Sequence, residues 1–401
     1  MSKKKLVIMG RGTAGVIALA YFTKLVGDQC DIELHHNPEI PPQAVGEGSQ
    51  VSLPRALFES FGFTFRNGLP HVDGSEKHGI YKTGWAGSGD YMHDFEMPSI
   101  GMHFNAVKLQ NYILETLKGK YKLVESNITD HSQIDADFIM DCSGKPSNYD
   151  DFNVLETIPV NSVYVTQCYW DKPEFNYTLT LARPWGWVFG IPLQNRCSIG
   201  YMYNNTISSI DEIKEDVKNV FLEYNLTPST DTNSFSFKNY YRKKNFDGRV
   251  VYNGNASFFL EPLEATSIHV MCQINELALQ YWFLGHPEDV VHVKCEQLNM
   301  EVEAVIMLHY FAGSKYDTKF WDFAKERGEK CIKNALVNTN NLIEFIEKSK
   351  EEQNTLLAKQ QGWQGRGYGS WGFFSFKQNL ENLDLYKKFD PLISDIMSSA
   401  K

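Results

Sequence analysis

The feature that most constrains the fold of this chain is a glycine-rich turn placed directly between an apolar strand and a helix. Residues 6–9 are all apolar, which is typical of a buried parallel strand. Residues 10–15 follow with the spacing GxGxxG, residues 16–26 carry apolar side chains at helical spacing, and residues 31–35 form a second strand pattern. This order of strand, turn, helix and strand predicts a dinucleotide-binding unit.

Each glycine of this turn has a physical task in binding a dinucleotide. Gly10 permits the tight turn, Gly12 lets the backbone approach a pyrophosphate, and Gly15 allows the helix to pack closely on the strand. The first helical residues, Thr13 and Ala14, belong to a helix N-terminus that offers N–H donors to the phosphates. The alternative is a tight strand–helix turn that binds no ligand.

The acid that usually binds the ribose is replaced in this chain. A carboxylate normally ends the second strand of a dinucleotide-binding unit, and the matching place here holds His35 and His36. His36 can hydrogen-bond a ribose hydroxyl, although less strongly than a carboxylate, and the two histidines could equally be solvated. Glu47 is the better candidate for a dinucleotide contact.

Two further turns favour a flavin over a nicotinamide cofactor. Residues 141–144 end one strand pattern with a short run of small residues, and Gly254 and Asn255 end another. In flavoproteins, such elements close around the adenosine half and the ribityl chain. Each could be a plain turn when taken alone, but their order along the chain predicts a flavin site that includes Gly254 and Asn255.

The composition excludes several other classes of protein. The net charge of −10 implies no basic face for nucleic acid. The seven cysteines form no CxxC pair, so we expect neither a disulfide framework nor a metal site, but reduced thiols in a cytoplasmic protein. No apolar run is long enough to span a membrane, and the N-terminal residues do not resemble a signal peptide.

The patterns along the chain predict an α/β fold with two lobes. Residues 1–160 are expected to form a Rossmann-like flavin-binding domain, and residues 161–245 an antiparallel-sheet substrate lobe with alternating strands. Residues 246–285 are expected to return to the first domain, and residues 286–401 to form a mainly helical C-terminal region.

Short motifs in a fixed order resemble the flavin-dependent halogenases of the tryptophan-halogenase family over roughly residues 5–325. The motifs are GRGTAG at 10–15, Val45-Gly46-Glu47, Lys77-His78-Gly79-Ile80 through Trp85, Trp187 to Pro192, Glu261 to Ser267, Leu308-His309-Tyr310, Asp317-Thr318 and Phe320-Trp321. The resemblance implies that reduced FAD, O₂ and a halide ion yield hypohalous acid, which halogenates a small, electron-rich aromatic substrate. It also implies a two-component system in which a separate flavin reductase supplies FADH₂; a homo-oligomer is left open.

The resemblance assigns two catalytic residues and a halide site. Lys77 would hold the oxidised halogen, by a hydrogen bond to hypohalous acid or as a haloamine, beside the substrate. The alternative to this catalytic role is that Lys77 is a surface lysine beside Glu76. Glu264 would polarise the oxidant or take the proton from the arene, and its alternative is an acid that satisfies amides at a helix N-terminus. The amides of Thr266 and Ser267 would hold the halide.

A strand with large apolar side chains would separate the flavin from the substrate. In the family, this segment is thought to block simple monooxygenation, and here it contains Trp187, Phe189, Ile191 and Pro192. The alternative is ordinary packing of a core strand.

Three departures from the family pattern lead to further expectations. Phe189 stands where a tryptophan is usual, Ala265 where a serine is usual, and Ser267 where a glycine is usual. Because a side chain at 267 restricts the backbone of the halide loop, we expect bromide or iodide to be preferred over chloride. The rival functions are an FAD-dependent monooxygenase and a non-catalytic flavin-binding protein.

The length of the chain leads to two more expectations. With 401 residues it is shorter than typical enzymes that act on free tryptophan, which favours a compact member of the family, such as a phage-encoded one. We therefore expect a more open pocket and a broader range of electron-rich aromatic substrates. Residues 362–374, rich in glycine and aromatics, form either a mobile rim of that pocket or a surface-packed tail.

Overall fold

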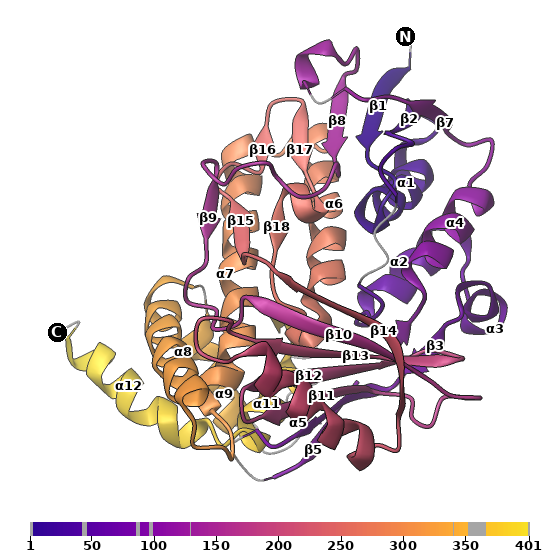
Figure 1. Cartoon of the computed structure of the whole chain (residues 1–401). Helices are drawn as coiled ribbons and strands as arrows, with labels where there is room; N and C mark the ends of the chain where they lie inside the picture. The colour runs from indigo at the N-terminus through magenta and orange to yellow at the C-terminus, as the bar shows by residue number, and fades with distance from the viewer. Residues whose placement is uncertain are drawn as a thin grey trace. The chain divides into compact units, whose positions relative to one another are not determined.

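The computed structural model describes residues 3–41, 46–85, 89–95, 99–128, 130–339, 341–351 and 366–399 (Figure 1). The chain divides into two compact units. Unit 1 contains Met1–Glu76, Gly101–Val154 and Asn239–Glu296, and unit 2 contains Lys77–Ile100, Leu155–Lys238 and Gln297–Lys401. Each unit is therefore assembled from three separate stretches of the chain.

Unit 1 is built on a six-stranded sheet with the order β16-β17-β8-β1-β2-β7. The strands from β17 to β7 pair in parallel, and β16 pairs with β17 in antiparallel fashion. The apolar run of β1 is at most 5% exposed, because a strand flanked on both sides and covered on both faces must be apolar throughout. The strands are β1 (Lys4–Met9), β2 (Cys30–His36), β7 (Lys122–Glu125), β8 (Phe138–Asp141), β16 (Phe246–Asp247) and β17 (Val250–Tyr252).

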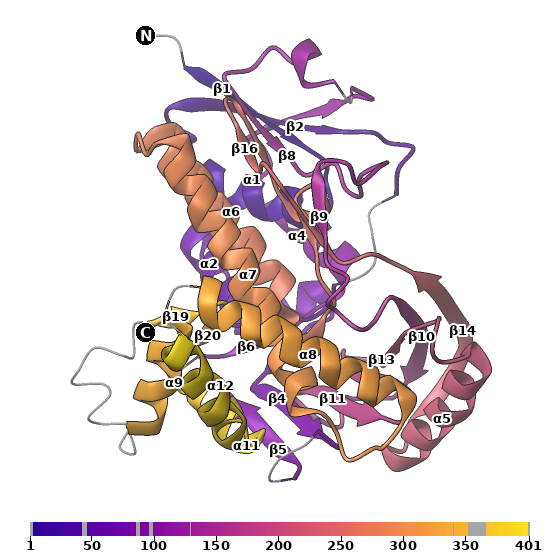
Figure 2. The ribbon, with the colours of Figure 1, turned by 90° about the vertical axis from the view of Figure 1, so that its left-hand side faces the viewer.

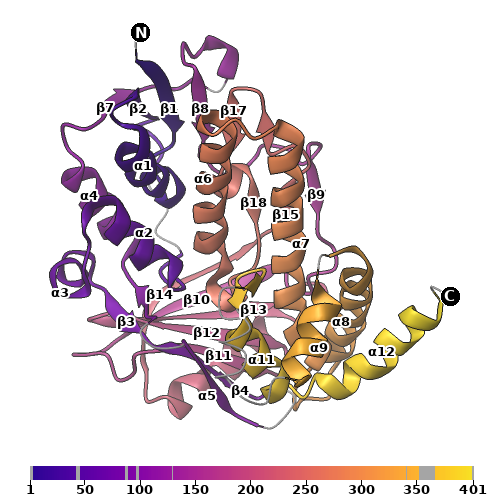
Figure 3. The same cartoon turned by 180° about the vertical axis from the view of Figure 1, so that it is seen from behind.

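The helices of unit 1 pack around α1, which follows the glycine turn. Helix α1 contacts β1, β2 and β8 and lies alongside α6 (Figure 3). The helices and short 3₁₀ turns are α1 (Thr13–Val26), α2 (Ser52–Phe61), α3 (Phe65–Gly68), η1 (Leu69–Val72), α4 (Ala106–Thr116), η2 (His131–Gln133), η3 (Gly254–Ala256), η4 (Leu263–Ala265) and α6 (Thr266–Phe283). The small sheets contain β3 (Ser75–Lys77) with β6 (Gly101–His103), and β18 (Phe258–Phe259), β15 (Tyr240–Arg242) and β9 (Phe152–Val154).

Unit 2 is built on a seven-stranded sheet with the order β14-β10-β13-β12-β11-β4-β5. All of its pairs are antiparallel except β11 with β4, which is parallel. The strands are β4 (Gly79–Thr83), β5 (Tyr91–Asp94), β10 (Ser162–Tyr169), β11 (Thr178–Arg183), β12 (Gly186–Pro192), β13 (Arg196–Tyr203) and β14 (Thr227–Ser236).

One face of this sheet is covered by helix α5 (Ile210–Glu223), which contacts β10 and β13 (Figure 2). A capping box begins the helix: the hydroxyl of Ser209 accepts from the N–H of Glu212, whose carboxylate accepts from the N–H of Ser209. The apolar side of α5, with Ile213, Val217 and Val220, joins the buried core of the sheet.

The remaining helices follow in the C-terminal part of the chain. They are α7 (Glu288–Ala312), which runs from unit 1 into unit 2, and α8 (Lys319–Asn338), α9 (Leu342–Glu351), α11 (Phe373–Asn382) and α12 (Tyr386–Ser399). A two-residue hairpin of β19 (Gly367–Tyr368) and β20 (Trp371–Gly372) precedes α11.

The predicted α/β class with a Rossmann-like first domain is confirmed, and so are the antiparallel strands between residues 163 and 203. Two features differ from the expectations. Strands β4 and β5 belong to the seven-stranded sheet of unit 2, whereas the segment that begins with Lys77 was expected to belong to the flavin-binding domain of residues 1–160. Strand β14 was not predicted as a strand, whereas helices α11 and α12 lie in residues 286–401, which were expected to be mainly helical.

The aromatic tail also differs from both alternatives that the sequence left open. Trp371 and Phe373 are 2% and 1% exposed, so they are core residues rather than a rim or a surface tail. Gly362 and Trp363, the start of that segment, lie outside the described residues.

Two general properties concern possible cofactors and location. In the described ranges, no helix is both long and apolar enough to cross a membrane, and no cluster of three or more His, Cys, Asp or Glu side chains could hold a metal ion. All seven cysteines are free thiols.

Candidate active site

The glycine turn after β1 has the backbone geometry that only glycine tolerates. Gly10 has a φ of +94°, and a Cβ there would lie 2.3 Å from the carbonyl oxygen of Cys142. A Cβ on Gly15 would lie 1.9 Å from the carbonyl oxygen of Gly10. These two glycines therefore set the close approach of β1, α1 and the segment after β8.

Gly12 differs from its neighbours, because a Cβ there would meet nothing within 4 Å. Its φ of −72° and ψ of −177° are open to any residue, so neither backbone strain nor protein packing requires glycine at this position. Open space at the N-cap of α1 is where a bound pyrophosphate would lie, facing the positive end of the helix. The turn thus fits the cofactor that its sequence predicts, with Thr13 and Ala14 as the first helical residues.

An alanine at Gly12 is therefore expected to leave the fold intact and to weaken cofactor binding. The free energy of unfolding should change by no more than about 0.5 kcal/mol. The dissociation constant for FAD should rise by about tenfold or more, equivalent to about 1.4 kcal/mol, because the methyl group fills the space of the phosphates. Quenching of flavin fluorescence on titration, together with thermal melting, measures both quantities.

The matched control is Gly372→Ala, at the N-cap of α11. Gly372 also has an extended backbone, with φ −68° and ψ 165°, and a Cβ there also meets nothing within 4 Å. This variant should bind FAD like the wild type. Equal FAD affinity in both variants would contradict the assignment of Gly12 to the pyrophosphate site.

The end of β2 presents a buried histidine beside this turn. His36 is 7% exposed, and among the described residues neither of its ring nitrogens has a side-chain hydrogen-bond partner. Burial lowers the pKa of His36, and the nearby charge of Arg11 lowers it further, so the imidazole is neutral at pH 7. His35 instead turns to Glu33, with 2.9 Å between Nε2 and Oε2. Of the two histidines, His36 is therefore the one that fits the predicted hydrogen bond from a ribose hydroxyl, and that contact stays a prediction.

The ends of β8 and β17 meet through backbone and side-chain hydrogen bonds. The N–H of Asn253 donates to the carbonyl of Asp141 at 2.8 Å, and the Asn253 side chain donates to Asn275 at 2.9 Å and to the carbonyl of Met271 at 3.0 Å. Gly254 has a φ of +57°, and a Cβ there would lie 2.5 Å from that of Ala14. The carbonyl of Asn255 accepts from the hydroxyl of Tyr240 at 2.8 Å.

Asp141 is held as a carboxylate within this group. Its oxygens lie 2.8 Å from Nε2 of His131 and 2.8 Å from the N–H of Ser143. Although burial alone would raise the pKa of Asp141, the bonds to His131 and Ser143 lower it below its ordinary value. Glu47, the other predicted dinucleotide contact, is 6% exposed, and its carbonyl accepts from the N–H of Phe104 at 2.9 Å.

Lys77 is completely buried, with 0% of its surface exposed. Its ammonium lies 5.5 Å from the centre of the Phe95 ring. Lys77 is therefore not the surface lysine that was the alternative to a catalytic role. It is the last residue of β3 and the first residue of unit 2.

Glu264 lies in a strained turn at the start of α6. Glu264 and Ala265 have φ angles of 68° and 52°, in the left-handed region that non-glycine residues rarely adopt. The carbonyl of Glu264 accepts from Nε2 of Gln50 at 2.7 Å, and the N–H of Ala265 donates to the carbonyl of Pro262 at 2.9 Å. Glu264 is 2% exposed, so the turn holds its side chain inside the protein.

The predicted halide residues begin the helix that follows. Thr266 is the first residue of α6 and is 0% exposed, and Ser267 is partly buried. The sequence placed the backbone restriction at Ser267. The structure instead places Ser267 in the helix and the left-handed conformation at Glu264 and Ala265.

The predicted partition residues occupy alternate positions of β12. Trp187, Phe189 and Ile191 share one face, whereas Val188 joins the core on the α5 face. The rings of Trp187 and Phe189 are 6.1 Å apart, and Gly200 on β13 leaves room for Phe189, since a Cβ there would lie 2.0 Å from that ring. Pro192 ends the strand.

The predicted site residues thus fall into two groups. Unit 1 holds the glycine turn, His36, Glu47, Gly254, Asn255, Glu264, Thr266 and Ser267; unit 2 holds Lys77, Trp187, Phe189, Ile191 and Pro192. The pairing of Lys77 with Glu264 stays a prediction.

Sequence reasoning missed the residues that support these groups. Gln50, which binds the backbone of Glu264, lies three residues after Glu47, and Asn253 directly precedes the predicted Gly254. The sequence signal that could have identified Gln50 and Asn253 is that each lies within three residues of a predicted site residue. In unit 2, a buried network joins Lys82 to Nε2 of His309 at 2.8 Å and to Oδ1 of Asn379 at 2.5 Å, to which Tyr91 also donates at 2.9 Å. Of these four residues, the motifs contained His309 and, within the segment from Lys77 to Trp85, Lys82.

The sequence model of the tryptophan halogenase family matches residues 5–128 and 118–364 of the chain. Among characterised proteins, tryptophan 7-halogenase RebH of Lentzea aerocolonigenes is 23% identical, with 80% of this chain and 79% of that protein covered. Tryptophan 6-halogenase ThaL of Streptomyces albogriseolus is 22% identical over the same shares.

Solved structures show the same fold. Xcc4156, a flavin-dependent halogenase from Xanthomonas campestris, superposes with a TM-score of 0.70 at 21% identity, covering 81% of this chain and 80% of that one. BrvH, a flavin-dependent halogenase from Brevundimonas sp. BAL3, superposes with a TM-score of 0.71 at 19% identity, covering 96% and 90%. With the family model matching most of its length, this chain belongs to the tryptophan halogenase family of flavin-dependent oxidoreductases, which use FADH₂, O₂ and halide.

Proposed function

We propose that this chain halogenates an electron-rich aromatic compound, with Lys77 and Glu264 at the reaction site. Reduced FAD, together with O₂ and a halide ion, supplies hypohalous acid. A separate flavin reductase provides the reduced FAD. The observation that carries the proposal is the left-handed turn at Glu264 and Ala265, which fixes a buried carboxylate at the start of α6.

Lys77 holds the oxidised halogen beside the substrate. Its ammonium can hydrogen-bond hypohalous acid, or its neutral amine can exchange a proton for the halogen with release of water. In both cases the aromatic carbon gains the halogen and loses its proton, and the oxygen leaves as water. Full burial of the side chain supports this role, because a confined oxidant reacts only with what lies next to it.

Glu264 acts on the oxidant or on the proton that the arene loses. A carboxylate within reach of the reacting carbon can accept this proton as a general base. Two consecutive left-handed residues cost of order 1–2 kcal/mol each, and such strain persists at functional sites where it fixes a side chain. The hydrogen bond from Gln50 to the Glu264 carbonyl holds the turn in place.

The halide is held at the N-terminus of α6. Thr266 and Ser267 are its first two residues, and the first N–H groups of a helix have no partner within the helix. The change from left-handed Ala265 to right-handed Thr266 gives the nest geometry in which successive N–H groups converge on an anion. The positive end of the helix dipole adds to the attraction.

Bromide or iodide is the preferred halide under this proposal. Ala265, in the left-handed turn, and Ser267, in the first turn of α6, stand where the family has serine and glycine, so the shape of the nest changes. Bromide and iodide are less tightly hydrated than chloride and more easily oxidised, so they tolerate such a site better. Trp187 and Phe189, on the face of β12 away from α5, separate the flavin from the substrate.

One assay tests this function. The full chain receives reduced FAD, O₂, equal concentrations of chloride, bromide and iodide, and in turn an indole, a phenol and free tryptophan. Mass spectrometry is expected to detect halogenated indole and phenol, with bromide or iodide incorporated at least about tenfold more than chloride. This ratio is equivalent to about 1.4 kcal/mol between the competing transition states.

The other outcomes are distinct. A clear preference for chloride would reject the halide assignment, and turnover of free tryptophan alone would reject the broad substrate range. An oxygenated product without halogen would identify an FAD-dependent monooxygenase. Bound FAD with no product of either kind would identify a non-catalytic flavin-binding protein.

A further inference from the structure

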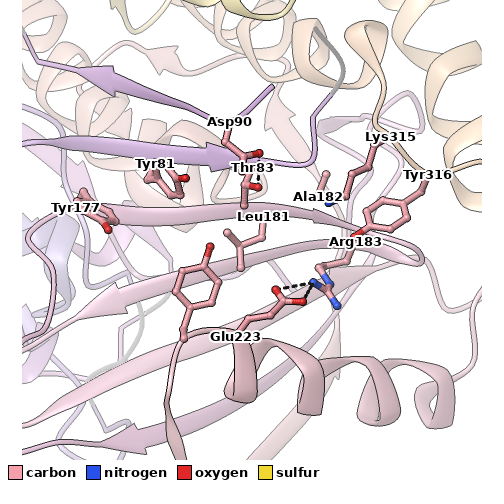
Figure 4. Close-up of a pocket in the computed structure, with 11 residues that line it drawn as sticks. Tyr81, Thr83, Asp90, Tyr177, Leu181, Ala182, Arg183, Glu223, Lys315 and Tyr316 are labelled. Atoms are coloured by element: carbon pink, nitrogen blue, oxygen red, sulfur yellow. Dashed lines mark hydrogen bonds and ion pairs between the residues drawn. The ribbon is translucent and has the colours of Figure 1, made fainter. Parts of the chain in front are cut away.

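A pocket of about 480 Å³ lies in unit 2, on the α5 side of the seven-stranded sheet. Its lining includes Tyr81, Thr83, Tyr177 and Leu181 from the segment of β4 and β11, and Tyr224 from the end of α5 (Figure 4). The volume falls within the range of sites that bind small molecules, about 300–1,000 Å³. Trp187 and Phe189 lie on the opposite face of the sheet from this pocket, so it is separate from the proposed partition.

Aromatic rings form one end of the pocket. Tyr81 and Tyr177 are 5.6 Å apart between ring centres, and Tyr177 stacks on Phe175 at 5.1 Å. Tyr81, Tyr177 and Tyr224 all pack against the core under α5, which holds their rings in fixed positions. Burial raises the pKa of Tyr81 and of Tyr224, so these phenols are neutral and can donate hydrogen bonds. Within the described residues, none of the three hydroxyls has a hydrogen-bond partner.

Charged side chains form the other end. In Figure 4, Arg183 points toward Glu223 and Lys315 lies nearer Tyr316, both on the side of the view away from Tyr81 and Tyr177. The positive charge of Arg183 is already neutralised, because its guanidinium donates to Asp216 at 2.7 and 3.0 Å and to Glu223 at 3.0 Å. Asp90 is likewise occupied, by Thr83 and by the N–H of Gly84 at 3.1 Å.

Lys315 is the positive charge that remains available at this end, where Asp90 and Glu223 are the carboxylates of the lining. It is exposed, and no carboxylate in the described part of the chain pairs with it. Its ammonium lies 5.4 Å from the centre of the Tyr316 ring, which positions it without neutralising it. A ligand that matches the pocket therefore has a flat apolar body for the tyrosines and an anionic group for Lys315.

We propose that this pocket is a second binding site, which takes an aromatic carboxylate with its ring on Tyr81, Tyr177 and Tyr224 and its carboxylate on Lys315. The phenol hydroxyls donate to polar atoms on the ring or to the carboxylate. The site is separate from the proposed halogenation chemistry and does not depend on it. A bound acid would be kept near the enzyme without entering the reaction site.

The test measures binding to the full chain by isothermal titration calorimetry, with no flavin added. The probes are indole-3-acetate and its uncharged analogue indole-3-ethanol, which differ only in the carboxylate. The acid is expected to bind the wild type at least about tenfold more tightly than the alcohol, because only the acid pairs with Lys315. Lys315→Gln should remove this difference and leave the affinity for the alcohol unchanged.

Two further variants complete the test. Lys319→Gln is the matched control, since Lys319 is also an exposed lysine, four residues away, that does not line the pocket, and it should behave like the wild type. Tyr177→Ala should weaken both probes, with thermal melting to check that it folds. The proposal is overturned if the acid does not bind, or if its affinity is unchanged in both Lys315→Gln and Tyr177→Ala.

Discussion

Replacing Lys77 by methionine is expected to lower the halogenation rate by about 10³-fold or more, equivalent to about 4 kcal/mol of transition-state stabilisation. Methionine has nearly the length and apolar body of lysine, but it can neither donate a hydrogen bond to hypohalous acid nor form a haloamine. The side chain is fully buried, so no neighbouring water can take over the role of the amine. Single-turnover assays with excess reduced FAD and a fixed concentration of an indole measure the rate.

The controls separate loss of chemistry from loss of structure. Lys319→Met, at an exposed position of unit 2, should keep the wild-type rate, and FAD titration should give equal affinities for all variants. Lys77→Arg keeps the charge but cannot form a haloamine at neutral pH. Recovery of activity in this variant would favour the hydrogen-bonding role of Lys77, and continued loss would favour the haloamine. A Lys77→Met enzyme with more than about a tenth of the wild-type rate would contradict the catalytic assignment.

The glycine turn was predictable because its requirements are local. Gly10 and Gly15 are fixed by carbonyl oxygens within 2.3 Å of the positions where a Cβ would stand, and such contacts recur wherever a strand, a tight turn and a helix follow one another. The apolar run of β1 and the helical spacing after it likewise depend on neighbours in the sequence. The same holds for α5, which begins with a complete capping box at Ser209 and Glu212.

The placement of the Lys77 segment was not predictable, because it depends on a distant pairing. Strand β4 pairs in parallel with β11, whose residues lie about a hundred positions later. Nothing in the alternation of residues 79–83 indicates which sheet they join. Residues 227–236 were missed for a related reason: polar side chains dominate β14, which is an edge strand and so has no need of an apolar pattern.

The conformation of the Glu264 turn could also not be predicted from the sequence. The comparison with the family pattern pointed to Ser267, because a residue that stands where glycine is usual is expected to adopt the strained backbone conformation. The backbone instead turns left-handed two and three residues earlier, at Ala265 and Glu264, where Gln50 donates to the carbonyl of Glu264. A hydrogen bond from a segment about two hundred residues away helps to hold that conformation, and such a contact leaves no local signal.

Replacing Asp216 by alanine is expected to lower the free energy of unfolding by about 3–5 kcal/mol. Asp216 accepts from Arg183 at 2.7 and 3.0 Å and from the hydroxyl of Tyr201 at 2.9 Å, and both of these donors are buried. Without the carboxylate, the guanidinium keeps only Glu223, and the Tyr201 hydroxyl loses its acceptor. Urea unfolding followed by circular dichroism measures the change.

The neighbouring Glu215 provides the matched control on the same helix. Its side chain is 76% exposed and, among the described residues, forms an ion pair with Lys218 alone, so Glu215→Ala should change the free energy of unfolding by no more than about 0.5 kcal/mol. Asp216→Asn keeps the volume and one acceptor oxygen but not the charge, and it should fall between the two alanine variants. Equal stabilities of the Asp216 and Glu215 alanine variants would show that the buried ion pair contributes little.

The same carboxylate predicts how stability depends on pH. Burial alone would raise the pKa of Asp216, but the hydrogen bonds and charge of Arg183, with Tyr201 and Asn219, lower it below its ordinary value. A lowered pKa in the folded state means that the unfolded chain binds the proton first as the pH falls. The stability gained from Asp216 is therefore complete above the unfolded pKa of about 3.9 and is lost as the pH falls through the folded value.

The difference in unfolding free energy between the wild type and Asp216→Asn should stay constant from pH 7 to about pH 5 and narrow only below about pH 4. Narrowing that already occurs between pH 7 and pH 5 would mean that the carboxylate is not held by Arg183 as the structure has it.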